Sequence, residues 1–290
     1  MKRIVTLQDI SCVGCCSITV ALPIISAMGV ECGILPTAVL SNHTMFKRIT
    51  CKDISGQIEP ISDMWKKENI TFDGVYTGYL ASKEQCAQVV RFFERFSNEG
   101  NLTLVDPAMA DNGKLYPAFG EDFPKAMAEV CARADVIVPN ITEAALLTGM
   151  PYKTEYDHEY IKELLERLLE LGCGTAVLTG VSYEPEKLGV AYLDRAGKEF
   201  SYFTKRCAQS YHGTGDIYAS TVMGGLMRGL DLGDALSLAA DYVVACIETT
   251  AASEDGRWYG AQFEPAIPRL CTMHRERPDS RAQDEYNQIL

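Results

Sequence analysis

Short runs of β-forming residues alternate with segments of helical periodicity along most of this chain. Strands are predicted at 3–9, 32–41, 72–80, 102–109, 135–140 and 175–181, and helices at 17–29, 61–69, 83–100, 123–134, 142–149 and 158–172. Strands that alternate with helices predict a mostly parallel sheet with helices on both faces, which is a three-layer α/β/α sandwich.

One stretch departs from this alternation. KLGVAYLD and EFSYFTKR predict an antiparallel strand pair near 188–204, and strands at 188–193 and 199–204 would cover or extend a sheet edge. Two long helices close the chain, and no linker or repeat divides it. We therefore expect one domain over 1–272 and a polar tail over 273–290.

Composition narrows the class of protein. Lys plus Arg is 27 and Asp plus Glu is 39, so the net charge of -12 argues against nucleic acid as the main partner. The chain is too long for a typical disulfide scaffold, so we expect its eleven cysteines to be reduced. Cys12, Cys15 and Cys16 lie close together, but a structural zinc site needs four ligands and no second C-x-x-C pair exists.

No membrane partner is expected. Residues 235–252 come closest to a membrane span, but Asp241 and Glu248 interrupt them. Asp9 and Pro23 argue against a signal sequence near the N-terminus. We expect a soluble, cytoplasmic protein.

Polar residues that directly follow a strand are the first candidates for a site, because ligands bind at the carboxyl ends of strands in such sheets. Asp106 closes one strand, and Asn140 ends the next, with Glu143 one helical turn further on. A carboxylate and an amide there suit a hydrated Mg²⁺. The same spacing is that of a helix cap with a capping box, which spacing alone favours, and the two roles can coexist.

Thr179 and Gly180 lie at the end of the strand at 175–181. A hydroxyl and an unhindered backbone suit a phosphate there, but taken alone the two residues favour an ordinary strand-to-loop turn.

The segment HGTGD, residues 212–216, precedes a run of small and apolar residues. A helix that starts near Thr214 would direct unpaired N–H groups at one point, and Gly213 and Gly215 would let an anion approach them. Asp216 at the rim could accept a proton from a substrate hydroxyl. A turn, a cap and a carboxylate that complements the helix dipole would explain the same spacing. The segment is neither a P-loop nor a dinucleotide fingerprint.

Taken together, these segments resemble the pyridoxal/pyridoxamine kinase family of the ribokinase-like superfamily. The matching pieces run from near the N-terminus to about residue 250, and they are QDISCVG, LSNHTMF, TGYL, DPAMAD, VPNITE, VLTG and HGTGDIYAS. DPxMxD and PNxxE are shared with hydroxymethylpyrimidine kinases, whereas SNHT and GYL are more similar to the pyridoxal branch.

The resemblance implies an ATP-dependent kinase that phosphorylates the 5′-hydroxyl of a B6 vitamer, with Mg²⁺ as cofactor and a homodimer as the assembly. Whether a monovalent cation such as K⁺ is also needed stays open. The implied roles are a general base at Asp216, an anion hole at Gly213, Thr214 and Gly215, a pyridine pocket walled by Ser11, Thr44 and Tyr79, metal ligation by Asp106 and Glu143, and further contacts to ATP from Asn140, Thr179 and Gly180.

Some features leave alternatives open. Relatives with a cysteine after DPxMxD can capture an aldehyde, but residues 111–120 contain none, so pyridoxine and pyridoxamine stay open as substrates. A hydroxymethylpyrimidine kinase, a sugar or nucleoside kinase and a non-catalytic binding protein of this fold are the alternative functions. His43 is expected near the pocket, and no role follows for His212.

Overall fold

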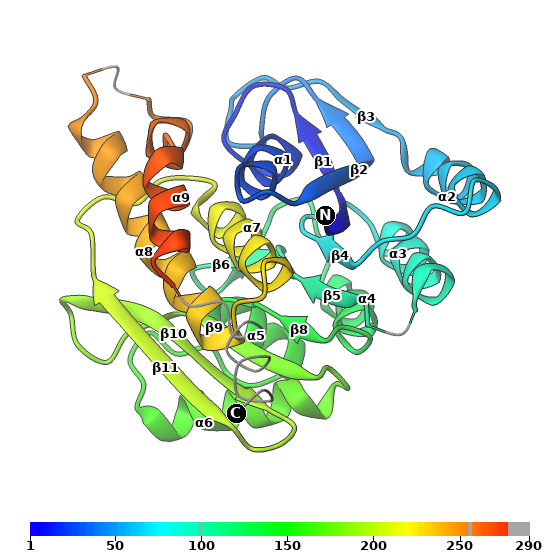
Figure 1. The fold of residues 1–290 in the computed structure, drawn as a ribbon. Coiled ribbons are helices and arrows are strands. Elements are labelled where there is room, and N and C mark those ends of the chain that lie inside the picture. Colours follow the sequence, from blue (N-terminus) through cyan, green and yellow to red (C-terminus); the bar gives the residue numbers. More distant parts are fainter. Residues whose placement is uncertain (99, 255–256, 278–290) are drawn as a thin grey trace, which may run out of the picture.

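The computed structural model describes residues 1–98, 100–254 and 257–277 of the chain. Its main sheet has nine strands in the order β11-β10-β9-β8-β5-β4-β1-β2-β3 (Figure 1). Six strands pair in parallel: β1 (Arg3–Ser11), β2 (Glu31–Leu40), β4 (Gly74–Thr77), β5 (Leu102–Val105), β8 (Val136–Ile137) and β9 (Thr175–Val181). The predicted, mostly parallel sheet is confirmed.

Helices cover both faces of this sheet (Figure 1). One face carries α1 (Ile18–Ala27), α7 (Thr214–Met227), α8 (Leu232–Ala252) and α9 (Ile267–Arg275). The other carries α2 (Ile58–Lys67), α3 (Lys83–Phe96), α4 (Phe123–Cys131), α5 (Ile141–Thr148) and α6 (His158–Glu170). Side chains alternate along each strand, so Ile4 joins the first core and Val5 the second.

Antiparallel strands lie at both edges of the sheet. β10 (Lys187–Asp194) pairs with β9 and with β11 (Glu199–Lys205), which confirms the predicted strand pair as an extension of one edge. At the other edge, β3 (Cys51–Asp53) pairs with β2. The sequence did not predict β3, because three exposed residues are too few to show a period.

Short elements complete the fold. A separate hairpin is formed by β6 (Ala110–Asp111) and β7 (Lys114–Leu115), and two turns of 3-10 helix lie at η1 (Ser55–Gln57) and η2 (Glu264–Ala266).

Helix α8 (Leu232–Ala252) meets the length and hydropathy criterion for a membrane span, which the sequence analysis expected it to fail. Its averaged hydropathy and length of 21 residues would suffice to cross a membrane, despite Asp241 and Glu248. Half of its apolar window is buried inside the fold, and Ala235 packs against Gly225 of α7. Buried core helices meet the same criterion, so α8 is weak evidence for a membrane span.

The C-terminal helix crosses the expected domain boundary at residue 272. α9 continues to Arg275, and the Arg277 guanidinium donates to Asp241 Oδ2 at 2.8 Å on α8. The structure therefore docks residues 273–277 onto the domain, and the rest of the predicted tail, 278–290, lies outside the described residues.

Candidate functional site

Helix α7 begins at Thr214, as predicted, and its first turn is open. Gly213 is the N-cap with φ +83°, and a Cβ at this position would overlap the carbonyl oxygen of Cys15. Gly215 differs, because no atom lies within 4 Å of the position that its Cβ would take. Among the described residues, the N–H groups of Thr214 and Gly215 have no protein acceptor. The helix start therefore presents free donors to an anion.

Asp216 and Asp106 share one region of the site. Burial and, as the second cause, the charge of Asp106 together raise the pKa of Asp216 to about 8. Burial also raises the pKa of Asp106, with the charge of Glu143 as the second cause. In the described part of the chain, neither Asp216 nor Asp106 forms an ion pair. Two unpaired carboxylates at the ends of α7 and β5 form a site that favours a proton or a cation.

Glu143 and Asn140 form the capping box of α5. Asn140 Oδ1 accepts from the Glu143 N–H at 2.9 Å, and Glu143 accepts from the Asn140 N–H at 2.9 Å. The other oxygen of Glu143 accepts from the Met109 N–H at 3.1 Å, and Asn140 Nδ2 donates to the Ala110 carbonyl at 2.9 Å. The cap interpretation is confirmed. These bonds also fasten the loop after β5 to the start of α5.

The carboxylate that best fits a magnesium ion is that of Asp106. Glu143 already accepts backbone N–H groups with both oxygens, so it is held as a buried support, and burial raises its pKa to about 7. No cluster of three His, Cys, Asp or Glu side chains that could hold a metal occurs in residues 1–98, 100–254 and 257–277. Mg²⁺ can nevertheless bind through one or two carboxylates when phosphate oxygens and waters complete its coordination.

The carboxylate of Asp9 lies near the end of β1 and, like that of Glu143, is buried. Asp9 accepts from the Ser11 hydroxyl at 2.9 Å and from the Ser17 hydroxyl at 2.6 Å. Asp9 is 4% exposed, and burial raises its pKa. The hydroxyl proton of Ser11, one of the residues predicted to wall the pyridine pocket, is thus directed at Asp9. The sequence analysis assigned no role to Asp9 or Ser17.

Tyr79, in the loop after β4, lies close to the same end of β1. Burial raises its pKa to about 12, and the charge of Asp9 adds to this shift. Its ring centroid is 5.4 Å from that of Phe119. Thr44 lies in an exposed loop, next to the buried His43. Ser11 and Tyr79 therefore both lie near Asp9, whereas Thr44 is exposed to solvent.

His43 joins two loops that are distant in sequence. Its Nδ1 accepts from the Met45 N–H at 3.3 Å, so the ring proton is on Nε2, which donates to the Tyr259 carbonyl at 2.6 Å. The loop after β2 is thereby tied to the loop after α8, beside the pocket.

Aromatic contacts reinforce this connection. The ring centroids of Phe46 and Trp258 are 4.7 Å apart, and those of His43 and His212 are 4.4 Å apart. Burial lowers the pKa of His212 to about 4, so this imidazole is neutral at pH 7. His212 therefore packs as an uncharged ring directly before the start of α7.

Thr179 and Asn140 are neighbours across β9 and the end of β8. They form a parallel bridge, and the Thr179 hydroxyl donates to the Pro139 carbonyl at 3.3 Å. Gly180 has φ +75°, and nothing lies within 4 Å of the position of its Cβ. An incoming group can therefore approach the backbone at Gly180.

Sequence reasoning missed Tyr116 as a wall of the site. Its N–H donates to the Met109 carbonyl at 2.9 Å, and the charges of Glu143 and Asp106 add to the burial that raises its pKa. Turn residues dominate this stretch, so no periodic signal marks the tyrosine in the sequence.

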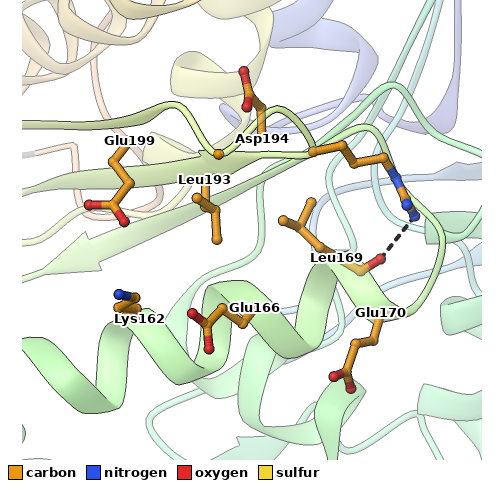
Figure 2. Close-up of a pocket in the computed structure, with 9 residues that line it drawn as sticks. Lys162, Glu166, Leu169, Glu170, Leu193, Asp194 and Glu199 are labelled. Carbon is orange, nitrogen blue, oxygen red and sulfur yellow. Dashed lines mark hydrogen bonds between the residues drawn. The ribbon is translucent and has the colours of Figure 1, made fainter.

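A surface hollow of about 490 Å³ lies between α6 and the β10–β11 turn (Figure 2). Asp194 pairs with Thr175, the first residue of β9, so the hollow lies at the amino ends of the parallel strands. Arg195 closes one side by donating to the Leu169 carbonyl at 3.0 Å. Ligands of this fold bind at the opposite edge of the sheet, so the hollow is not our candidate site.

Comparison with known proteins agrees with this geometry. The model of the phosphomethylpyrimidine kinase family matches residues 6–261. The chain belongs to this family. The match begins within β1 and spans the remaining strands to β11, and it includes the start of α7 and the carboxylates of Asp9, Asp106, Glu143 and Asp216.

Solved structures similar to this kinase come from both substrate branches. A candidate phosphomethylpyrimidine kinase from Bacteroides thetaiotaomicron, crystallised with pyridoxal, is 35% identical, with 93% of this chain and 95% of that chain covered and a TM-score of 0.88. Pyridoxal kinase from Lactobacillus plantarum is 31% identical, with 94% and 98% covered and a TM-score of 0.86.

A curated relative represents the pyrimidine branch. The hydroxymethylpyrimidine/phosphomethylpyrimidine kinase of Bacillus subtilis is 26% identical over 220 residues, which are 74% of this chain and 77% of the relative. The protein is thus a kinase that phosphorylates an alcohol group, with the ribokinase-like fold of the pyridoxal kinases. Relatives of both kinds match it, so the comparisons leave the alcohol itself open.

Proposed function

We propose that this kinase transfers the γ-phosphoryl group of ATP to the 5′-hydroxyl of a B6 vitamer, with Asp216 as the general base. The observation that carries the proposal is the position of Asp216: it lies in the open first turn of α7, close enough to Asp106 and Asp9 for their charges to act on it. Two relatives above 30% identity, one crystallised with pyridoxal and one a pyridoxal kinase, support a B6 vitamer over a pyrimidine alcohol as the substrate.

The residues divide the chemistry between them. The free N–H groups of Thr214 and Gly215 receive the negative charge of the transferring phosphoryl group. Asp216, whose pKa burial raises to about 8, takes the proton from the attacking hydroxyl. A raised pKa makes the carboxylate a stronger base. Most of the rate then comes from positioning and charge stabilisation.

Asp106 would hold the magnesium ion, with Glu143 supporting the loop behind it. When bound, Mg²⁺ would neutralise phosphate charge and offset the repulsion among the buried carboxylates. Thr179 and Gly180 would face the phosphates at the neighbouring strand end, and Asn140 would fix that end through the capping box.

A side-by-side assay tests the choice of substrate. The purified enzyme with Mg·ATP would be given pyridoxal, pyridoxamine, pyridoxine and the hydroxymethylpyrimidine alcohol, and ADP release would be measured for each. We expect the highest kcat/KM with a B6 vitamer. A clear preference for the pyrimidine alcohol would overturn the proposal.

The pyrimidine alcohol is the second candidate substrate. The match to the phosphomethylpyrimidine kinase family and the Bacillus subtilis relative favour it. The two substrates share the hydroxymethyl group on which Asp216 acts, so the catalytic assignment is the same for both.

The proposal also includes a homodimer and a cytoplasmic location. Whether K⁺ stimulates the reaction is a question for kinetic assays. Sedimentation of the purified protein should give twice the chain mass of 32.0 kDa. Assays in sodium and potassium salts of equal ionic strength would show whether K⁺ raises kcat.

A further inference from the structure

We propose that Asp9 is a positioning residue for Asp216: it holds Ser17 in a strained backbone conformation in which the Ser17 N–H faces the Asp216 carboxylate. This inference rests on the role of general base proposed for Asp216. It concerns Asp9 of β1 and Ser17 of the β1–α1 connection, which the reaction itself does not touch.

Ser17 has an unusual conformation for its residue type. Its φ is +53° and its ψ is -137°, directly before the first residue of α1. Among the described residues, the other non-glycine residues with positive φ are Asn69 and Asn112, and asparagine tolerates this region better than serine. Such a conformation costs roughly 1–3 kcal/mol and persists only where neighbouring groups hold it.

Asp9 stabilises this conformation of Ser17. Its carboxylate accepts from the Ser17 hydroxyl at 2.6 Å, in a charge-assisted hydrogen bond between two residues that are each 4% exposed. The pairing of β1 with β2 shifts register between Gln8 and Ile10, and such irregularities re-aim a side chain. Asp9 lies at this shift, and its second oxygen accepts from Ser11.

The backbone of Ser17 in turn faces the reacting carboxylate. Hydrogen bonding from the Ser17 N–H lowers the pKa of Asp216, against the larger effects of burial and of Asp106. The same connection packs against the helix start, because Cys15 leaves no room for a side chain at residue 213. Residues 15–17 and 213–216 therefore form one packed unit, and Asp9 anchors it from β1.

A fixed donor on the base has a specific consequence. The Asp216 carboxylate accepts from the Ser17 N–H and from its own N–H, and two backbone donors hold it in one orientation, so that it meets the substrate hydroxyl repeatedly in the same geometry. Small displacements of reacting groups reduce turnover strongly, by up to roughly a hundredfold for 1 Å. The hydrogen bond between Asp9 and Ser17, called the anchor below, should thus affect kcat more than the binding of Mg·ATP.

Four variants test the anchor. Ser17→Ala removes the hydroxyl and keeps the strain, whereas Ser17→Gly removes the hydroxyl and tolerates the positive φ. Asp9→Ala removes the acceptor, and Asp9→Asn retains an oxygen that can accept from Ser17. We expect kcat to fall about tenfold to a hundredfold in both alanine variants, with the KM for Mg·ATP within about threefold of wild type. Ser17→Gly and Asp9→Asn should keep kcat within about fivefold of wild type.

Controls separate this effect from a general loss of structure. Ser62→Ala removes another buried serine hydroxyl, which donates to the Ile58 carbonyl in α2, and should leave kcat unchanged. Near-UV circular dichroism and thermal melting report folding of each variant. If Asp9→Ala does not fold, the two Ser17 variants provide the test, because Ser17→Ala removes one hydroxyl, Ser17→Gly removes one CH₂OH group, and both leave Asp9 in place.

The outcomes distinguish the anchor from the base. Asp216→Asn with near-normal kcat would remove the proposed base, and the anchor with it. An inactive Asp216→Asn enzyme together with a folded Ser17→Ala enzyme of normal kcat would overturn the anchor alone. Equal losses of kcat in Ser17→Ala and Ser17→Gly would also overturn it, because the hydroxyl rather than the backbone conformation would then matter.

Discussion

The backbone of Gly213 packs against the carbonyl oxygen of Cys15 so closely that a methyl group at residue 213 would overlap it. Two residues to the C-terminal side, Gly215 faces open space. The two glycines of the GTGD segment therefore serve different purposes: Gly213 lets α7 dock on the β1–α1 connection, and Gly215 lets a ligand approach the helix start.

Alanine at each glycine should separate these purposes. Gly213→Ala combines positive φ with a steric overlap, so we expect a loss of more than about 2 kcal/mol in the free energy of unfolding. Gly215→Ala should leave the free energy of unfolding within about 1 kcal/mol of wild type and raise the KM for Mg·ATP. Urea denaturation and steady-state kinetics measure the two effects. Equal destabilisation by both substitutions would contradict the distinction.

Asp216→Asn should lower kcat by about 10²–10⁴-fold, because the amide cannot accept a proton from the alcohol. ATP binding should change little, since the donors at Thr214 and Gly215 remain. Calorimetric titration with ATP and a coupled ADP-release assay measure both quantities. An unchanged kcat in this variant would remove Asp216 from the mechanism.

The free energy of unfolding should depend on pH, because the charged form of Asp216 destabilises the folded state. The pKa of Asp216 is about 8 in the folded protein, against an ordinary value of 3.8. The folded state therefore binds a proton that the unfolded chain releases, and this contribution to stability is lost as the pH rises from about 4 to about 8. Above pH 8, Asp216→Asn should melt at least about 2 °C higher than wild type in the absence of ligands. Melting curves of both proteins across this pH range provide the test, and a lower melting temperature for the variant would refute it.

The pH dependence of turnover should have the opposite sign. The base must be deprotonated to act, so kcat should rise with pH through the pKa of Asp216 as it stands in the ternary complex. Bound Mg²⁺ would lower this pKa below the ligand-free value, because a cation favours the charged carboxylate. A kcat profile that falls over the same range would contradict the assignment.

Glu143→Gln should weaken the loop that carries Asp106. The amide can accept with one oxygen only, so its NH₂ group would face either the Asn140 N–H or the Met109 N–H. We expect a loss of roughly 1–3 kcal/mol in the free energy of unfolding and a reduced kcat. Asn140→Asp keeps the cap acceptor but loses the donor to the Ala110 carbonyl and places a carboxylate against it, so it should cost at least as much. Urea denaturation of the two variants measures the difference.

Much of the architecture could be predicted from the sequence. The alternation of strands and helices, the antiparallel pair after β9 and the start of α7 at Thr214 each follow from local patterns of periodicity, turn residues and glycine. The capping box of Asn140 and Glu143 was predictable for the same reason, because its two residues are three apart in the chain. β3 was missed, because it forms only through its partner strand.

The sequence by itself determined which residues end the strands and begin the helices, and so it placed Asp106, Asn140, Thr179 and Asp216 at the same edge of a sheet. Only the tertiary structure decided that Asp9 and Ser17 lie beside Asp216, that His43 ties the loop after β2 to the loop after α8, and that Glu143 is buried as a support. The physical reason is the distance along the chain between the residues that interact. Periodicity and caps arise from neighbours within one turn or strand, whereas burial, pKa shifts and strained backbone depend on groups that meet only when distant segments pack together.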